Sequence, residues 1–360
     1  MTYANPKLVL DSTTLQAGEV AWRSPSNIAL VKYWGKHGRQ LPRNANLSFT
    51  LNAAHTETRI HYRRGGGQQV ELEFYFEGQP NEAFGKKVHD YLSSITEIFP
   101  FLRQLHLTVH SHNSFPHSAG IASSASAMSA LALCLCSLEQ RLFGTLDTEL
   151  AFRQKASYVA RLGSGSACRS VYGGAAVWGK HMELSDSSDE YAVPFGESLH
   201  DVFRSFRNSI LIVSQDEKSV SSRAGHALME ENRYAQDRYQ QAGQRMQRLL
   251  PALRRGDVKT VGEIIEAEAL TLHALMMAST PPYLLLQPNT IAVINELWAW
   301  RKDSSVPLYF SLDAGPNLHL LYPKSETERV GSFIQSQLRS YAADGKIIED
   351  RVGAGPLQLA

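Results

Sequence analysis

Residues 111–143 read SHNSFPHSAGIASSASAMSALALCLCSLEQRLF, and this stretch indicates how the first half of the chain folds. The segment that leads into it, LHLTVHSHN at 105–113, has the apolar–polar alternation of a strand. Small residues then run into a long apolar helix. The first N–H groups of a helix lack partners within it, and the helix dipole is positive there. The stretch is therefore either a phosphate-binding helix start or a small-residue start that tight packing requires.

Two common phosphate and nucleophile motifs are absent. Residues 174–180, GAAVWGK, approach a P-loop, but His181 stands where a Ser or Thr is needed to hold Mg²⁺. The four spacer residues, AAVW, also favour a strand over a loop. No GxSxG nucleophile elbow occurs.

Composition and charge exclude several classes of protein. The 360 residues are 43% hydrophobic and 20% charged, and the net charge is +1. This balance predicts no nucleic-acid partner and no binding to acidic membrane surfaces. Three cysteines are too few for a disulfide framework, so we expect a reduced, cytoplasmic protein. No signal peptide and no apolar segment of membrane-spanning length is visible, so no membrane partner is predicted.

The order of strands and helices predicts an α+β protein of two domains. In the first half, TRIHYRRGGGQQVELEFYF at 58–76 is typical of a hairpin around three glycines, and a helix is expected over 148–162. In the second half, SILIVSQ opens a new domain. Helical patterns there cover 224–253, 257–278, 290–301 and 325–342, and two strands flank the turn DAGPN. We place the boundary between domains 1–195 and 196–360.

Three further segments carry residues suited to anion chemistry. SPSNIALVKYWGKHG delivers Lys32, Tyr33 and Lys36 at the end of an apolar strand, as an anion site or as ordinary surface lysines. RLGSGSACRSVYGG at 161–174 combines small hydroxyl residues with Arg169. SVSSRAGH places Arg223 before a helix, as an anion contact or within a capping segment.

Asp313 lies at a strand end in SLDAGPNLHL, where turn chemistry alone explains an Asp, and a general base is the alternative. Other conspicuous residues are interpreted as structural. Cys168 is expected to be a small buried residue, because no His–Asn pattern supports a nucleophile. Glu263, Glu266 and Glu268 are expected on a solvated helix surface.

Taken together, several segments resemble the diphosphomevalonate decarboxylases of the GHMP kinase superfamily. The matching segments are NIALVKYWGK, PRNANLSFTL, SFPHSAGIASSASA, RLGSGSACRSVYGG, SVSSRAGH, LHALMMASTPPY and FSLDAGPN. They extend from Asn27 to Asn317, and the joint occurrence of KYWGK, GSGSACRS and DAGPN is highly specific. The resemblance implies an N-terminal half like ribosomal S5 domain 2, a ferredoxin-like C-terminal half, an active site in the cleft between them, and a homodimer.

The resemblance also implies a reaction. Mevalonate 5-diphosphate would be phosphorylated on its 3-hydroxyl by ATP with Mg²⁺, and would then lose phosphate and carbon dioxide to give isopentenyl diphosphate. Two alternatives stay open: a mevalonate monophosphate decarboxylase, and a small-molecule kinase of the mevalonate 3-kinase type that stops at phosphorylation.

Residue roles are carried over from the family motifs. The catalytic residues implied are Asp313 as acid/base, Lys32 beside it, Arg169 on the substrate carboxylate, and Ser124. Substrate binding is implied for Tyr33, Lys36, Ser164, Ser166, Arg169 and Arg223. ATP binding is implied for Ser111, Asn113, Gly120, Ser123, Ser124 and Ser126, with Ser124 also the candidate Mg²⁺ contact.

The chain departs from the family pattern in several places. His117 and Ile121 stand where Thr and Leu are usual, and Ala45 and Asn46 replace two serines. His226 ends SSRAGH, where bacterial members often carry Met, and an Arg often found before LNG is not visible. These departures leave room for a monophosphate substrate.

Overall fold

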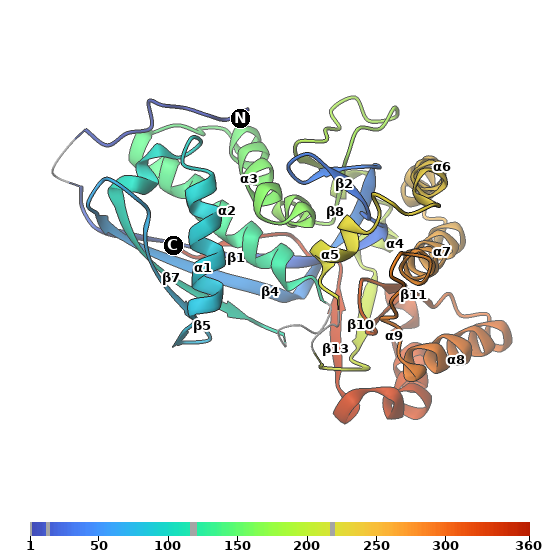
Figure 1. The fold of residues 1–360 in the computed structure, drawn as a ribbon. Helices are drawn as coiled ribbons and strands as arrows, with labels where there is room; N and C mark the ends of the chain where they lie inside the picture. The colour runs from blue at the N-terminus through green and yellow to red at the C-terminus, as the bar shows by residue number, and fades with distance from the viewer. Residues whose placement is uncertain (1, 12–14, 116–120, 217–219) are drawn as a thin grey trace.

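The protein folds around two sheets that lie side by side, each covered by helices (Figure 1). The computed structural model describes residues 2–11, 15–115, 121–216 and 220–360. Within these residues the larger sheet has the strand order β14-β1-β4-β7-β5-β6, and β8 pairs with both β4 and β9. A small hairpin, β2–β3, lies between β1 and β4 in the sequence. The expected α+β fold is confirmed.

The strands of the larger sheet and of the hairpin have the following bounds: β1 (Gly18–Val31), β2 (Lys36–His37), β3 (Leu41–Pro42), β4 (Asn46–Arg64), β5 (Glu71–Phe76), β6 (Gln79–Pro80), β7 (Leu105–Asn113), β8 (Ala175–Trp178), β9 (Ala192–Pro194) and β14 (Leu357–Gln358). Three helices cover this sheet: α1 (Glu82–Ser94), α2 (Ser123–Phe143) and α3 (Glu149–Gly163). Helix α2 packs on β1 and β4, and α3 packs on α2.

The predicted hairpin at 58–76 is wrong in its pairing, although both of its strands exist. Strand β7 lies between β4 and β5, antiparallel to β4 and parallel to β5. The reason is burial of one face of β7, since Leu105, Leu107 and Val109 are buried and the strand needs a partner on each side. A parallel neighbour needs a crossover, and α1 in the connection between β5 and β7 provides it.

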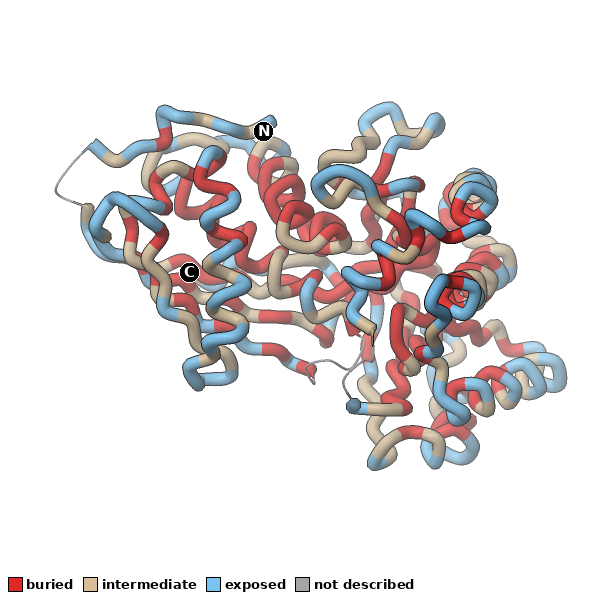
Figure 2. The backbone as a smooth tube through the Cα atoms, in the orientation of Figure 1, coloured by how far each residue is buried: buried red, intermediate tan, exposed pale blue. Residues whose placement is uncertain are grey.

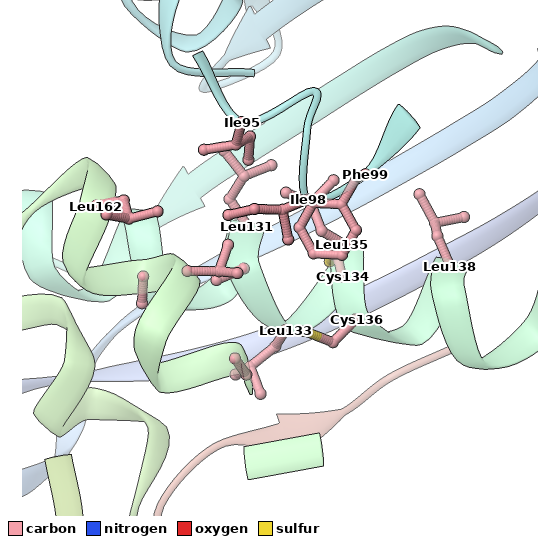
Figure 3. Packing of buried hydrophobic residues seen from close by; sticks show 14 of the residues in the cluster. Ile95, Ile98, Phe99, Leu131, Leu133, Cys134, Leu135, Cys136, Leu138 and Leu162 are labelled. Atoms are coloured by element: carbon pink, nitrogen blue, oxygen red, sulfur yellow. The ribbon is translucent and has the colours of Figure 1, made fainter. Parts of the chain in front are cut away.

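The core of the first lobe lies between α2, α3 and the sheet. Figure 3 shows Leu131, Leu135 and Leu138 of α2 meeting Ile98 and Phe99, which follow α1. Figure 2 shows buried positions concentrated along α2, α3 and the central strands, whereas α1 and α8 carry mostly exposed or intermediate ones. An apolar helix such as α2 is therefore an internal element of this lobe.

The second sheet is antiparallel, in the order β11-β12-β10-β13. Its strands are β10 (Arg207–Leu211), β11 (Tyr309–Leu312), β12 (Leu318–Tyr322) and β13 (Ile347–Arg351). The helices of this lobe are α4 (Asp201–Arg204), α5 (Ser222–Ala227), α6 (Ala235–Arg255), α7 (Val258–Met277), α8 (Pro288–Ser304) and α9 (Thr327–Phe333). Helix α7 packs on β11 and on α6, and it also reaches β1 of the first sheet.

The helix expected over 224–253 is two helices, α5 and α6. Asn232 explains the break, because its side chain accepts a bond from the Tyr234 N–H and donates one to the Leu275 carbonyl. Such local bonds compete with helical ones. The helix expected over 325–342 is regular only in α9 and continues as irregular turns to Tyr341.

The chain returns to the first sheet after β13. The Gly353 N–H donates to the Thr50 carbonyl, the Gly174 N–H donates to the Gly353 carbonyl, and β14 pairs with β1. Both termini therefore lie in the first lobe (Figure 1). The boundary at residue 195 stays a prediction.

Two further contacts join the lobes. The carboxylate of Asp350, at the end of β13, accepts the backbone N–H groups of Asn52, Ala53 and Ala54 at 2.7–2.8 Å. An apolar cluster also spans both lobes, with Phe49 of β4 beside Phe203 and Phe206.

His319 on β12 is buried, and this predicts a pH dependence of stability. Its Nδ1 lies 3.0 Å from the Asn208 side-chain amide, and burial lowers its pKa from 6.5 to about 4. Between these values the unfolded chain binds a proton that the folded chain does not, so stability present above pH 6.5 is lost as pH falls toward 4. We expect His319→Gln to flatten this loss by up to about 1.4 kcal/mol per pH unit.

Urea unfolding at several pH values measures how the free energy of unfolding changes with pH. This slope is compared between wild type and His319→Gln, so the absolute stability of the variant does not matter. His37→Gln serves as the control because His37 is exposed in the β2–β3 hairpin. Equal slopes for wild type and His319→Gln would contradict the prediction.

Candidate active site

A cavity of about 260 Å³ lies between the two lobes and brings together most of the predicted catalytic and substrate-binding residues. Its walls come from the end of β1, the start of α2, the 163–169 loop, α5, α7 and the β11–β12 turn. The predicted residues that line it are Lys32, Tyr33, Lys36, Ser124, Ser164, Ser166, Arg169, Arg223 and Asp313.

Lys32 and Asp313 form an ion pair at one end of this cavity. The Lys32 Nζ lies 2.9 Å from Asp313 Oδ1 and 2.8 Å from Ser311 Oγ. The Lys32 side chain is buried, whereas that of Asp313 is 24% exposed. Burial lowers the pKa of the Lys32 ammonium, and the Asp313 carboxylate opposes this shift. A carboxylate that lines the cavity beside a buried cation can accept a proton from the hydroxyl group of a bound ligand.

Glu268 holds the backbone on which Lys32 stands, and its expected place on a solvated helix surface is wrong. It is fully buried, and it accepts the Lys32 N–H at 2.7 Å. Arg238 and Arg245 both pair with its carboxylate at 2.6 Å. A buried carboxylate needs such partners.

The expected position on a solvated helix surface is wrong for Glu266 as well, and it is confirmed for Glu263. Glu266 is buried and pairs with Arg301, whereas Glu263 is exposed. The helical period would have found Glu268, since it lies on the same face of α7 as Ile264 and Leu272.

Arg169 is buried in the cavity wall and is held by three side chains that the sequence did not indicate. Its guanidinium donates to Asn27 Oδ1, Asn46 Oδ1 and Ser48 Oγ. Since a guanidinium has five N–H groups, these bonds leave one N–H on each terminal nitrogen without a partner in the described part of the chain. Burial lowers the pKa of Arg169, and the nearby Asp313 carboxylate opposes this. The arrangement orients a planar cation toward an anionic ligand.

The 163–174 loop forms a short 3-10 helix, η2 (Gly165–Val171), beside the cavity. A side chain at position 165 would place its Cβ 2.7 Å from the Tyr33 Oη, so only glycine fits there. The Tyr33 hydroxyl is buried without a protein partner, in a residue that lines the cavity. Cys168 does not line the cavity: it is buried, its thiol donates to the Gly165 carbonyl, and burial raises its pKa to about 12.

The opposite end of the cavity is cationic. Lys36 and Arg223 both line this end, and Lys36 Nζ bonds Gln40 Oε1 at 3.1 Å. Burial and then Arg223 lower the pKa of Lys36. This end suits a group with more than one negative charge.

His226 lies at the same end, between the rings of Tyr33 and Trp34 at 4.4 and 4.6 Å. Its Nδ1 accepts the Gly35 N–H at 3.0 Å, so the ring proton is assigned to Nε2 of a residue that lines the cavity. Burial lowers its pKa to about 3. The ring is therefore a neutral hydrogen-bond donor in the cavity wall.

The residues predicted to bind ATP fall into two groups. Ser123 and Ser124 form the first turn of α2, and Ser124 Oγ lies 3.3 Å from Ser164 Oγ across the cavity. Ser111, Asn113 and Ser126 are buried, and Thr56 Oγ1 bonds both Asn113 Oδ1 and Ser126 Oγ. Gly120 lies outside the described residues.

The start of α2 has the features that an anion or a hydroxyl-bound cation needs. Ala122 at the N-cap has a positive φ of 48°, and among the residues described no side chain caps the first N–H groups, although the Ala125 N–H donates to the Ala122 carbonyl. Within the described residues, no group of three or more His, Cys, Asp or Glu side chains could hold a metal ion. A metal at this site would depend on hydroxyl groups and on the ligand's own oxygens.

Two α+β lobes that meet at a cation-rich cavity, beside the start of a long helix, define a protein of the GHMP kinase type, and solved structures agree. Mevalonate diphosphate decarboxylase from Staphylococcus aureus has a TM-score of 0.81 at 29% identity, covering 96% of this chain and 99% of that one. A complex of MDDEF with MVAPP, AMPPCP and magnesium has a TM-score of 0.79 at 28% identity, covering 96% and 99%.

Sequence families and relatives agree with this class. The diphosphomevalonate decarboxylase-like N-terminal domain matches residues 24–191, and the mevalonate 5-diphosphate decarboxylase C-terminal domain matches 209–354. Diphosphomevalonate decarboxylase from Danio rerio is 31% identical over 316 residues, 83% of this chain and 74% of that protein. The Candida albicans enzyme is 26% identical over 94% of this chain and 97% of its own length. The chain belongs to the diphosphomevalonate decarboxylase family.

Within the described residues, no helix combines the length and apolar character needed to cross a membrane.

Proposed function

We propose that this protein catalyses the ATP-dependent decarboxylation of mevalonate 5-diphosphate to isopentenyl diphosphate, with release of ADP, phosphate and carbon dioxide. The observation that carries the proposal is the cavity itself. It holds an acid/base candidate, a carboxylate-binding arginine and a doubly cationic end in one space. The family relatives and the complex of MDDEF with MVAPP and AMPPCP support the same reaction.

Asp313 takes the proton of the 3-hydroxyl as that oxygen attacks the γ-phosphoryl group. Lys32, 2.9 Å from Asp313, fixes the carboxylate and adds a positive charge where the phosphoryl oxygens gather. When the phosphorylated oxygen leaves C3, the Asp313 carboxylate is the negative charge nearest to the electron-poor carbon.

Arg169 holds the substrate carboxylate through its two remaining N–H groups until carbon dioxide departs. Two N–H bonds to one carboxylate fix its plane as well as its position. Asn27, Asn46 and Ser48 keep the guanidinium in that orientation. Lys36 and Arg223, with Tyr33, Ser164 and Ser166 on the same wall, bind the diphosphate end of the substrate.

The start of α2 binds the nucleotide phosphates, with Ser123 and Ser124 as the hydroxyl donors. Mg²⁺, when bound, neutralises charge on the transferring phosphoryl group, and Ser124 is the residue placed to contact it. Ser111, Asn113, Gly120 and Ser126 complete the proposed nucleotide segment. A homodimer and a cytoplasmic location remain predictions from the resemblance and from the cysteine content.

One assay tests the proposal. Purified protein is given ATP and Mg²⁺ with mevalonate, its monophosphate or its diphosphate, and ADP and carbon dioxide are measured. We expect both products in equal amounts, and only with the diphosphate at full rate. ADP without carbon dioxide would identify a kinase, and preference for the monophosphate would change the substrate.

The buried position of His226 gives a further prediction for the same assay. We expect His226→Met to raise KM for mevalonate diphosphate about five- to tenfold with little change in kcat, because one neutral hydrogen bond contributes about 1 kcal/mol. Since a pKa of about 3 keeps this ring neutral, it adds no inflection to the kcat/KM profile between pH 5 and 8. His37→Met, in the exposed hairpin, is the control. An unchanged KM would remove His226 from substrate binding.

A further inference from the structure

A second hollow, of about 830 Å³, lies at the junction of the lobes and shares no lining residue with the active-site cavity. One side is formed by Gly173 and Gly174 of the first lobe and by residues 194–198, which connect the two lobes. The other side is formed by the start of β10, the end of β13 and Lys324 after β12. Both lobes therefore contribute to it.

The hollow concentrates positive charge in a chain that is almost neutral as a whole. Its lining carries one carboxylate, from Glu197. Against this, four cationic side chains line it: Arg204, Arg207, Lys324 and Arg351. Such a local excess of one sign raises the concentration of counter-ions in a cleft.

Arg207 and Arg351 are direct neighbours across the β10–β13 pair, so two like charges face the same side of the sheet. Directly opposed like charges destabilise a strand pair. Along the described chain, neither side chain makes an ion pair or a hydrogen bond, and the same holds for Lys324. Both acids of β13 are engaged elsewhere: Glu349 accepts a bond from Ser209, and Asp350 accepts the backbone N–H groups of residues 52–54.

The Nε of Arg207 is buried, and no residue that the structure describes gives it a hydrogen-bond partner. A buried unpartnered donor is unfavourable unless a ligand or water satisfies it. Arg204 is different, because it donates to the carbonyls of Leu199 and Glu197 and is thereby held at the rim. Arg204 is thus the fixed cation of the hollow. The other three cationic side chains have no hydrogen-bond or ion-pair partner among the residues described.

We propose that this hollow binds a small molecule bearing a chain of phosphate groups. A multiply charged phosphate chain would lie between Arg207 and Arg351, relieve their repulsion and supply an acceptor for the buried Nε. A single phosphate would leave most of the 830 Å³ unfilled. Because the ligand would contact both lobes, its binding stabilises their relative arrangement. Gly173 and Gly174 follow η2, which carries Arg169, so this segment connects the hollow to the active site.

Inorganic tripolyphosphate is the probe, and calorimetry with the full-length protein measures its binding. We expect Arg207→Gln and Arg351→Gln each to weaken one class of binding at least tenfold, and the double variant to abolish it. The active-site variant Arg223→Gln keeps this class, which separates the hollow from the catalytic cavity. Arg248→Gln, an exposed arginine on α6 with the same loss of charge, is the matched control.

A second readout distinguishes a ligand site from a merely structural role. Without probe, Arg351→Gln should have an equal or higher Tm, because it removes a like-charge pair, and it should lose the rise in Tm that tripolyphosphate gives the wild type. The kcat and KM of decarboxylation without probe should stay within twofold of wild type. These expectations do not depend on the proposed reaction.

Two arms identify the source of the phosphate chain. The binding class that the Arg207→Gln/Arg351→Gln double variant loses is compared for ATP and for tripolyphosphate. A tighter lost class for ATP would assign a nucleotide, and equal affinities would assign the phosphate chain alone. Undiminished tripolyphosphate binding by the double variant, or its loss in Arg223→Gln only, would overturn the proposal. Binding of an acidic peptide in place of tripolyphosphate would overturn it as well.

Discussion

Asp313→Asn is expected to lower kcat by about a thousandfold or more while leaving ATP affinity within a fewfold of wild type. The amide has nearly the shape of the carboxylate but cannot accept the hydroxyl proton, and general base catalysis contributes about 10²–10⁴ in rate. The change also removes the negative charge that faces Lys32 at 2.9 Å and that would stabilise electron-poor C3. Both phosphoryl transfer and the later loss of phosphate and carbon dioxide should therefore become slower.

Single-turnover kinetics and ATP calorimetry measure the two quantities separately. Asp303→Asn is the matched control, because Asp303 is exposed on α8 and does not line the cavity. A folded Asp313→Asn enzyme with near-normal turnover would remove Asp313 from the mechanism.

Arg169→Lys is expected to lower kcat/KM for carbon dioxide release by about a hundredfold or more. An ammonium cannot reproduce the planar fork, and it also loses bonds that now join Arg169 to Asn27, Asn46 and Ser48. Because the substrate carboxylate is the group Arg169 would hold, phosphorylation of the 3-hydroxyl should suffer less than decarboxylation. The ratio of ADP to carbon dioxide should then exceed one.

Parallel assays of ADP and carbon dioxide give this ratio directly. Arg248→Lys controls for a change of cation elsewhere, and Tm reports whether the buried site still packs. A ratio of one together with unchanged kcat and KM would contradict the carboxylate role of Arg169.

The sequence predicted most of the chemistry of this cavity because its reactive residues lie in short motifs. Lys32 and Asp313 are 281 positions apart, yet each stands at a recognisable strand end, and the structure pairs them. Their supporting residues were harder to find. Glu268 has no local signature, and only the side of α7 on which it lies reveals that it is buried.

The remaining differences have a common physical origin in long-range pairing. Nothing in the segment 58–76 indicates that β7, about thirty residues further along, inserts between its two strands. Asn46 looks like an ordinary strand residue, and its bond to Arg169 exists only because β4 and η2 meet. A local sequence pattern predicts where a helix or strand forms. Which strand pairs with which depends on the whole sheet.

The return of residues 350–358 to the first sheet affects how the protein folds during synthesis. During translation, the strands of the second sheet are synthesised before residues 353–358, which bond Thr50, Gly174 and β1. Until residues 353–358 have emerged, the N-terminal lobe keeps the carbonyl of Thr50 and the edge of β1 without these partners. Such distant pairings slow folding. Nascent chains stalled before Asp350 should accordingly be more sensitive to protease in the first lobe than the released protein.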